Sequence, residues 1–303
     1  MTMKEKILSY IKNPLLIFPF LGYRGFFHWM KDETYLKLVF RCKMGCWPDL
    51  KNPKTFNEKL QWMKLHDRNP LYTKLVDKYE AKKIVAGVIG EKYIIPTLGV
   101  WNKFDDIDFD KLPEQFVLKC THDSGGLVIC KDKSKLDIPA AKKKIEKCLK
   151  ANYFWGFREW PYKDIVPRII AEEYKVDESG TELKDYKIFC LNGEPEFLFV
   201  ATDRGIGKTK FDFFDKEFNH LPFKQHYPNN TEKKIHKPEG LPIMFELAKA
   251  LTKDFALCRA DFYDINGNVY FGELTFSHFS GLEPFEPAEW DLKFGEKVKL
   301  GCK

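Results

Sequence analysis

The sequence predicts an α+β protein whose strands pair in antiparallel sheets. Hairpin patterns predict the sheets, because runs rich in aromatic and β-branched residues flank short turns of Asn and Gly. Amphipathic stretches of helical length predict the helices. With 303 residues, 44% of them hydrophobic and 27 of them Phe, the chain can bury a large core. We expect an N-terminal, mostly helical subdomain over residues 1–95, a central subdomain over 96–175 and a C-terminal one over 176–303.

The net charge of +6, from 50 basic and 44 acidic residues, is mild for a chain of this length. It permits attraction to an anionic substrate or a membrane surface, but it is not the concentrated basic patch of a nucleic-acid-binding protein. The eight cysteines include no CxxC pair, and several lie in apolar runs. This spacing favours buried free thiols in a reducing compartment, the cytoplasm, over a disulfide framework or a zinc site.

The N-terminal residues are apolar and aromatic, but they do not predict a membrane span. Only 11 uncharged residues separate Lys12 from Arg24, whereas crossing a bilayer takes about 20. We also expect no signal peptide, because Asn13-Pro14 breaks the apolar run and no small-residue cleavage site follows it. Buried packing is one interpretation of this segment, and a peripheral contact at the inner face of the membrane is the other.

Four helices are predicted. Thr55 and Glu58 stand at capping-box spacing, so a helix begins there and runs to His66. A second is expected from Leu71 to about Val88. Residues 140–151 predict a basic helix with a solvated face, and residues 241–255 an amphipathic one.

Several strands are predicted around these helices. Residues 93–98 predict a short strand whose pairing Pro96 limits. Residues 168–175 predict a strand, and residues 185–200 a hairpin that turns at Asn192-Gly193. The polar tract over residues 204–238 predicts inserted loops and edge strands that face an anionic substrate.

Residues 116–120 and 127–130 predict two strands joined by a small-residue loop that contains Ser124, Gly125 and Gly126. Backbone amides in such a loop can approach phosphate oxygens, and Lys119 at the end of the first strand adds a positive charge. An ordinary hairpin with a Ser-Gly-Gly turn is the alternative.

The last hairpin, residues 255–276, has the clearest site pattern. If Asn266-Gly267-Asn268 is a three-residue turn, Tyr263 faces Phe271, Asp261 faces Glu273 and Arg259 faces Thr275 on one side. The other side is then an apolar core face made of Cys258, Ala260, Phe262, Tyr270, Leu274 and Phe276. A two-residue turn would shift this register and separate the facing acids.

Two carboxylates on facing strands, with Cβ atoms roughly 5 Å apart, repel each other unless a cation lies between them. Mg²⁺ binds in proteins through one or two carboxylates together with the phosphates of a nucleotide. Asp261 and Glu273 therefore suit a metal–nucleotide site. A solvated face with two unrelated acids is the alternative.

Taken in order, these motifs resemble the TupA-like (teichuronopeptide biosynthesis) branch of the ATP-grasp superfamily. The resemblance covers roughly residues 35–300 and rests on Asn52-Pro-Lys-Thr-Phe-Asn-Glu-Lys59, Asp77-Lys-Tyr79, Lys119-Cys-Thr-His-Asp-Ser-Gly-Gly126 and Phe271-Gly-Glu-Leu-Thr-Phe276. It implies the ATP-grasp fold, in which a nucleotide lies between two α+β subdomains with antiparallel sheets. The central subdomain would then carry the phosphate lid and the C-terminal subdomain the metal site. The implied cofactors are ATP and Mg²⁺.

The resemblance also implies a role for each candidate residue. Phosphate would be bound by Lys119 and Lys82 under a lid of Ser124, Gly125 and Gly126. Adenine would lie against Glu172, Glu173 and Tyr174, with Asp185 on the ribose and Lys187 in the same nucleotide-binding set. Asp261, Glu273 and Thr275 would hold Mg²⁺, and Thr275 stands where Asn is usual, which leaves open one ion or two. Arg259 would stabilise charge on the reacting group, and His122 is either the base for the amine or a structural residue.

The implied function is ATP-dependent, ADP-forming ligation in bacterial surface polysaccharide synthesis. An amino acid or amine would be joined to a uronic acid of a capsule glycan or sugar nucleotide through an acyl phosphate. A sugar kinase or glycan-modifying transferase with the same nucleotide site is one alternative. A non-catalytic glycan-binding scaffold is another. Residues 277–281 either meet the acceptor or form a simple turn.

Overall fold

The computed structural model describes residues 13–123, 125–177, 180, 183–203 and 208–301. Its α-helices are α2 (Ile17–Tyr23), α3 (Asp32–Met44), α4 (Phe56–His66), α5 (Leu71–Val76), α6 (Glu80–Ile89), α7 (Ile138–Leu149), α8 (Phe154–Phe157), α9 (Leu241–Thr252) and α10 (Glu289–Lys297). Its strands are β1 (Thr97–Trp101), β2 (Phe116–Cys120), β3 (Leu127–Cys130), β4 (Ile169–Glu173), β5 (Asp185–Leu191), β6 (Glu194–Thr202), β7 (Lys210–Phe214), β8 (Lys224–Gln225), β9 (Leu257–Ile265), β10 (Asn268–Thr275) and β11 (Phe285–Glu286). These elements confirm the predicted α+β class.

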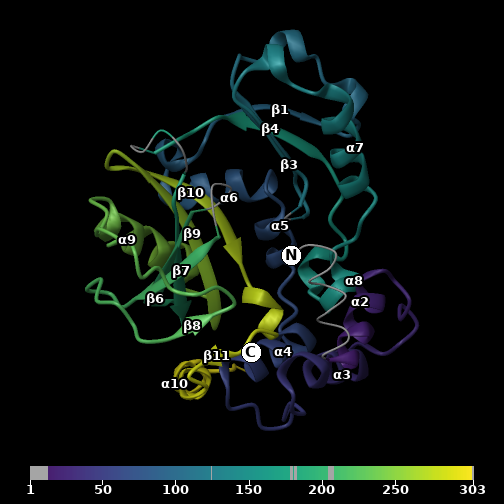
Figure 1. Ribbon diagram of the computed structural model, residues 1–303, viewed down its shortest axis with the longest axis vertical. Coiled ribbons are helices and arrows are strands. Elements are labelled where there is room, and N and C mark those ends of the chain that lie inside the picture. Colours follow the sequence, from purple (N-terminus) through teal and green to yellow (C-terminus); the bar gives the residue numbers. More distant parts are fainter. Residues whose placement is uncertain (1–12, 124, 178–179, 181–182, 204–207, 302–303) are drawn as a thin grey trace.

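In the described part of the chain, the strands form a four-stranded sheet, a five-stranded sheet and the small pair β11-β8. The four-stranded sheet has the order β1-β4-β2-β3, and α7 packs on it through Ala141 and Ile145 (Figure 1). The five-stranded sheet has the order β10-β9-β5-β6-β7. Both sheets are antiparallel, as predicted.

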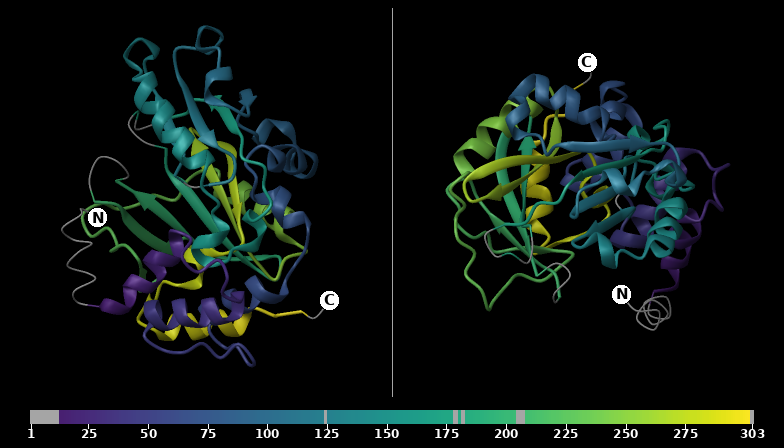
Figure 2. Two further views of the ribbon diagram at one scale, coloured as in Figure 1. Left: turned by 90° about the vertical axis from the view of Figure 1, so that its right-hand side faces the viewer. Right: turned by 90° about the horizontal axis from the view of Figure 1, so that it is seen from above.

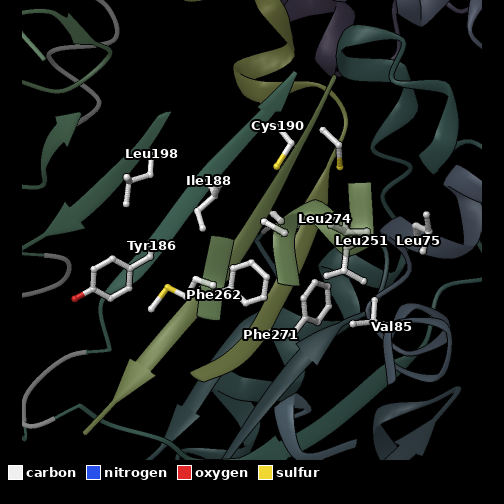
Figure 3. Close-up of a cluster of buried hydrophobic side chains, with 14 of the residues drawn as sticks. Leu75, Val85, Tyr186, Ile188, Cys190, Leu198, Leu251, Phe262, Phe271 and Leu274 are labelled. Carbon is white, nitrogen blue, oxygen red and sulfur yellow. The ribbon is translucent and has the colours of Figure 1, made fainter. Parts of the chain in front are cut away.

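The two faces of the five-stranded sheet differ. One face is apolar along its length and packs against α5, α6 and α9, as Figure 3 shows for Leu75, Val85 and Ile188. The other face is aromatic where α4 and α10 cover it, around Phe189. Two residues earlier on β5, that same face carries Lys187. The strands that build the core therefore also supply a row of charged side chains beyond the covering helices.

The helix predictions hold, with one correction. The helix over residues 56–66 begins with the predicted capping box of Thr55 and Glu58. The single helix expected from residue 71 to 88 is wrong, because α5 ends at Val76 and α6 begins at Glu80. Asp77 interrupts it: its Oδ1 accepts hydrogen bonds from the backbone amides of Tyr79 and Glu80 at 2.8 and 3.0 Å.

The register of the last hairpin differs from the prediction in an instructive way. The turn has two residues, Asn266 and Gly267, with φ values of 52° and 79°, so Asn268 pairs with Ile265. A β-bulge between Phe271 and Glu273 then restores the predicted pairs Asp261–Glu273 and Arg259–Thr275.

Only the segment between the turn and the bulge is reversed. Tyr263 therefore pairs with Tyr270, not with Phe271. Phe271 enters the apolar core in place of Tyr270 (Figure 3).

Three further expectations can be compared with the structure. The short strand predicted over residues 93–98 starts only at Thr97, after Pro96, and Ile94 forms an isolated bridge to Phe271. The described cysteines are free thiols. Among the described residues, no helix combines the length and the apolar composition needed to cross a bilayer. The division into subdomains at residues 95 and 175 stays a prediction.

Candidate functional site

A cavity of about 180 Å³ collects most of the charged side chains that the sequence pointed to. Strands from both sheets contribute to its lining, together with the segment between α5 and α6 and the loop between β2 and β3. Its walls are Lys78, Lys119, Cys120, Asp123, Gly126, Leu127, Glu172, Asp185, Lys187, Asp261, Tyr263, Gly272 and Glu273. The cavity therefore brings cationic and anionic groups together within one small space.

On the four-stranded sheet, one carboxylate is shared by two lysines. Glu172 on β4 forms ion pairs with Lys82 of α6 and, at 2.5 Å, with Lys119 of β2. Lys82 also donates to the carbonyl of Ile95 at 2.7 Å. Burial lowers the pKa of Lys82, and Glu172 opposes that effect. Burial would raise the pKa of Glu172, but Lys119 and Lys82 outweigh it and hold the pKa below its usual value. An incoming anion would find two ammonium groups with a single counter-charge between them.

The side chains of Glu172, Glu173 and Tyr174, predicted to lie together beside adenine, do not converge on one place. Glu172 points to the lysines, whereas Glu173 is 40% exposed in its side chain and pairs with Lys175 at 2.8 Å. The ring of Tyr174 lies under Lys131, 5.9 Å from its Nζ. A role for these residues beside adenine stays a prediction.

Lys78 belongs to the cavity and was not singled out from the sequence. Its backbone amide donates to the carbonyl of Thr121 at 3.0 Å, and its Nζ donates to the carbonyl of Asp123. The Asp77-Lys78-Tyr79 motif contains it, but the sequence pattern favours Lys82, which lies on the predicted helix. The break between α5 and α6 is what turns Lys78 toward the cavity.

The loop between β2 and β3 is folded against this lysine. The amide of Gly126 donates to both carboxylate oxygens of Asp123, at 3.0 and 3.1 Å. A Cβ at Gly126 would lie 2.5 Å from Sγ of Cys120, so only glycine fits there. Gly125 has open space around it by comparison, with Asp123 Oδ2 at 3.7 Å. Ser124 lies outside the described residues.

On the five-stranded sheet, Arg259 is the centre of a buried ion network. Its Nε and Nη2 each donate to a carboxylate oxygen of Asp261 at 2.7 Å. Nη2 also donates to Oε1 of Glu273 at 3.3 Å and to Oγ1 of Thr275 at 3.0 Å. Lys187, directly across from Asp261 on β5, donates to it as well and lies 3.5 Å from Asp185. The facing pairs restored by the bulge thus converge on one guanidinium.

In this network Arg259 stays protonated and Glu273 stays ionised. Burial lowers the pKa of Arg259, but the ion pair with Asp261 outweighs burial and keeps the pKa above its usual value. Burial would raise the pKa of Glu273, yet Lys78, Lys187 and Arg259 bring it to about 2. Glu273 is therefore ionised throughout the physiological range, and its side chain is 41% exposed at the cavity.

The predicted metal ligands can be tested for their fit to Mg²⁺. Within the described residues, no three His, Cys, Asp or Glu side chains converge as a ready metal cage. Asp261, Glu273 and Thr275 nevertheless offer oxygen donors only, with the Thr275 hydroxyl 3.5 Å from Glu273 Oε1. Hard oxygen donors from one or two carboxylates, completed by nucleotide phosphates, are what Mg²⁺ takes. The donor set fits, and Glu273 is its most accessible member.

His278 is a second residue that the sequence did not assign. It is fully buried, its Nδ1 lies 2.8 Å from Nη1 of Arg259, and its Nε2 lies 3.0 Å from Oε1 of Gln225. Since Arg259 must donate, Nδ1 accepts and the proton sits on Nε2. Burial and the charges of Arg259 and Lys187 hold the pKa of His278 well below its usual value. A neutral His278 thus holds the guanidinium of Arg259 in position by accepting this hydrogen bond.

Residues 277–281 form more than a simple turn. Phe279, Ser280 and Gly281 have φ values of 45°, 58° and 61°, a left-handed run that is costly for non-glycine residues. Ser280 is buried and donates from Oγ to Glu159 at 2.6 Å, while Lys64 donates to its carbonyl at 2.9 Å. These contacts hold the loop in place behind Arg259 and His278. Contact with an acceptor stays a prediction.

The structure does not place His122 on the cavity wall. Its ring is 2% exposed, and its Nε2 lies 3.1 Å from the carbonyls of both Cys148 and Ala151, at the end of α7. Cys120 and Asp123 line the cavity on either side of it, but the ring of His122 is held against the end of α7. These contacts support the structural interpretation, and a role as the base for an amine stays a prediction.

The polar tract expected to face an anionic substrate lies apart from this cavity. Three of its lysines, Lys233, Lys234 and Lys237, line a separate cavity of about 580 Å³, together with Tyr186 and Asp264. Tyr186 and Lys187 are neighbours on β5, so the two cavities lie on opposite faces of the sheet.

Comparison with known proteins gives the family. The model of a family described as TupA-like ATPgrasp matches residues 58–299. No curated protein matches the chain.

Solved structures give more distant likenesses. A D-alanine–D-alanine ligase from Bacillus anthracis complexed with ATP is 18% identical, with a TM-score of 0.40 over 67% of this chain and 54% of that one. The D-alanine–D-alanine ligase from Helicobacter pylori is also 18% identical, with a TM-score of 0.38 over 75% of this chain and 61% of that one. A biotin carboxylase from Campylobacter jejuni in a beta-gamma-ATP complex is 12% identical, with a TM-score of 0.40 over 88% and 54%. The chain thus spans 54–61% of the lengths of these three proteins.

Proposed function

The chain belongs to the TupA-like ATP-grasp family, and from that premise we propose that it is an ATP-dependent, ADP-forming ligase that joins a carboxylate to an amine. One observation carries the proposal: the cavity sets Lys78, Lys119 and Lys187 around the facing carboxylates Asp261 and Glu273. Cations that suit phosphate and acids that suit Mg²⁺ therefore share one space.

Each side of the cavity has a separate task in this proposal. On the side of the four-stranded sheet, phosphate oxygens of ATP are bound by Lys119 and Lys82. The same phosphates are approached by Lys78 and by the backbone amides of the loop at Gly125 and Gly126. Asp185 and Lys187 contact the nucleotide from the other sheet. Glu273, Asp261 and Thr275 hold Mg²⁺, which when bound would neutralise the charge of the phosphates.

The reaction proceeds in two displacements. An oxygen of the acceptor carboxylate bonds to the γ-phosphorus while the bond from that phosphorus to the bridging oxygen breaks, and ADP leaves with the electron pair. The amine nitrogen then bonds to the acyl carbon while the bond from that carbon to the phosphate oxygen breaks, and the departing phosphate takes the electron pair and the proton that the nitrogen loses. Arg259, kept charged by Asp261 and braced by His278, stabilises the negative charge that develops on the acyl oxygens.

We propose a uronic acid as the acceptor, either in a bacterial capsule or surface glycan or in a sugar nucleotide, and an amino acid or small amine as the donor. The family premise and the mildly positive charge of the chain support this substrate class. We place the reaction in the cytoplasm, which agrees with the free thiols of the described cysteines.

Product analysis by mass spectrometry tests the proposal. The protein is incubated with Mg-ATP, a uronic-acid-containing oligosaccharide and a pool of amino acids. We expect an amide-linked product and one ADP for each amide formed, and we expect both to disappear in Glu273→Gln. Glu286→Gln, which removes an exposed acid paired with Lys224 outside the cavity, serves as the matched control and keeps full activity.

Two outcomes would replace the proposal. A phosphorylated sugar without an amide would identify a kinase or transferase with the same nucleotide site. No nucleotide consumption and no effect of Mg-ATP on the melting temperature would identify a non-catalytic scaffold.

A further inference from the structure

An exposed apolar surface that the proposed reaction does not use lies on residues 15–31, called here the N-terminal segment. Its exposed side chains are Leu15, Ile17, Tyr23, Phe26 and Trp29, at 53%, 45%, 60%, 63% and 78% exposure. Single exposed apolar residues are ordinary on a protein surface, but five within so short a stretch are a feature that calls for a partner.

The segment that carries these exposed side chains is itself packed against the rest of the protein. Phe27 stacks on Phe18 with ring centroids 4.5 Å apart, and its carbonyl accepts a hydrogen bond from Nη2 of Arg158 at 2.7 Å. His28 stacks on Trp155 at 3.7 Å. Phe27 packs against the protein and is partly buried, whereas Phe26, His28 and Trp29 are exposed. Their exposure is therefore built into the fold.

The N-terminal segment is also cationic. Its charged residues are Arg24 and Lys31, and it contains neither Asp nor Glu. The first acids after it are already paired, Asp32 with Arg158 at 2.9 Å and Glu33 with Lys37 at 2.6 Å. Arg24 lies over the ring of Phe20 at 4.3 Å, so charge and aromatic surface are interleaved.

We propose that the N-terminal segment docks the protein on the surface of a bilayer that contains anionic phospholipid. Trp, Tyr and Phe suit the headgroup level of a bilayer, and Lys and Arg beside them suit anionic lipid. Helix α2 has seven residues, far fewer than the roughly 20 needed to cross, so it lies in the plane of the interface. The views in Figure 2 show α2 and α3 at the periphery of the molecule, where a flat surface can reach them.

The docking surface is linked to the cavity wall through packed segments. The carbonyl of Ala151, three residues before α8, lies 3.1 Å from Nε2 of His122, and the neighbouring Asp123 lines the cavity. Helix α2 also packs on α8, next to the segment that ends α7 (Figure 1). If the proposed ligation is correct, docking would bring the cavity close to acceptors attached to the membrane. The docking itself does not depend on that reaction.

Vesicle co-sedimentation of the full chain tests the proposal. We expect partition into phosphatidylcholine vesicles that contain phosphatidylglycerol, weaker partition into pure phosphatidylcholine, and a decline as salt is raised. Phe26→Ser combined with Trp29→Ser should reduce the partition coefficient about tenfold or more, because two aromatic side chains no longer enter the interface. Arg24→Gln combined with Lys31→Gln should remove the preference for the anionic vesicles.

Ile129→Ser is the matched control, since Ile129 is 51% exposed but lies on β3 of the four-stranded sheet. It should bind vesicles as the native chain does. Two results would overturn the proposal: no partition into anionic vesicles at low salt, or equal partition of the Phe26 and Trp29 double variant. Concentration-dependent dimerisation that the double variant abolishes would overturn it as well, because the surface would then bind a second copy. A ligase assay with a soluble acceptor reads the proposed function separately from any of these outcomes.

Discussion

The two sheets bring opposite kinds of charge arrangement to the cavity. On the four-stranded sheet, the carboxylate of Glu172 is shared by Lys82 and Lys119, whose side chains are 13% and 23% exposed. On the five-stranded sheet, Asp261 is 1% exposed and holds Arg259 and Lys187 at once, while Glu273 adds a further, partly exposed carboxylate. The four-stranded sheet therefore presents ammonium groups to a ligand, and the five-stranded sheet presents carboxylate oxygens that a rigid ion network holds in place.

We therefore expect the lysine side of the site to rearrange when a ligand binds, and the Arg259–Asp261 side to stay rigid. We expect the lysines to exchange Glu172 for phosphate, because both ammonium groups lie on flexible chains and Lys119 lines the cavity. The Arg259–Asp261 pair is buried under aromatic packing and braced by His278, so it keeps its geometry.

Asp261→Asn should have the largest effect on stability. It keeps the shape of the side chain but leaves Arg259 and Lys187 buried without their shared negative charge. We expect the free energy of unfolding to fall by about 3 kcal/mol or more, measured by denaturant titration, with loss of ATP turnover. Asp108→Asn, on an exposed acid paired with Lys111, is the control and should leave the denaturation midpoint essentially unchanged, because an exposed ion pair contributes little to stability. A loss as small as that of the control would show that the network is not a rigid frame.

Glu172→Gln should destabilise the protein less, by about 2 kcal/mol, because its two lysines can turn toward water. Its informative effect is on the nucleotide. If phosphate replaces Glu172 as the partner of Lys82 and Lys119, removing the competing carboxylate makes Mg-ATP bind more tightly, as measured by calorimetric titration. Glu173→Gln, on the neighbouring and more exposed acid, should leave the affinity unchanged. Weaker binding by Glu172→Gln would contradict the exchange and favour a contact of Glu172 with adenosine.

The pH dependence of stability should report the neutral state of His278. The unfolded chain binds a proton at a pKa near 6.5, whereas folding lowers the pKa of His278, so stability is retained above about pH 6.5 and lost as the pH falls. We expect a loss of roughly 1 kcal/mol between pH 6.5 and 5.5 from this group. His278→Gln keeps a side chain able to bond Arg259 but does not titrate, so its denaturation midpoint should fall less over this range. An identical pH dependence in both proteins would contradict the assignment.

The sequence predicted those parts of the molecule that depend on local rules. The capping box of Thr55 and Glu58 starts α4 as expected, because it involves only neighbouring residues. The facing pair Asp261–Glu273 is also confirmed, although the turn has two residues where three were expected. A compensating bulge at Gly272 keeps the pair together, and a bulge leaves little trace in a single sequence. The same slip explains why Tyr270 and Phe271 exchange faces.

What the sequence did not predict depends on contacts between distant segments. His278 meets Gln225 and Arg259 only because the left-handed run after β10 turns back over the sheet. Lys78 reaches the cavity because Asp77 breaks a helix that periodicity alone would continue. His122, two residues after a cavity strand, is instead held by the end of α7. Propensity and spacing describe neighbours along the chain, and these three positions are decided by tertiary packing.

We propose that ATP binds between the two sheets with its phosphates on the lysines of the four-stranded one. Calorimetric titration of Mg-ATP into the native chain, Lys119→Met and Lys135→Met tests this placement of the nucleotide. Lys135 is 81% exposed in its side chain and pairs with Asp132 outside the cavity, so it is a matched control. We predict binding to the native chain and to Lys135→Met, and an affinity about tenfold or more weaker for Lys119→Met, because a charge-assisted hydrogen bond to phosphate is lost. Equal affinity for all three proteins, or no binding to any, would contradict the account.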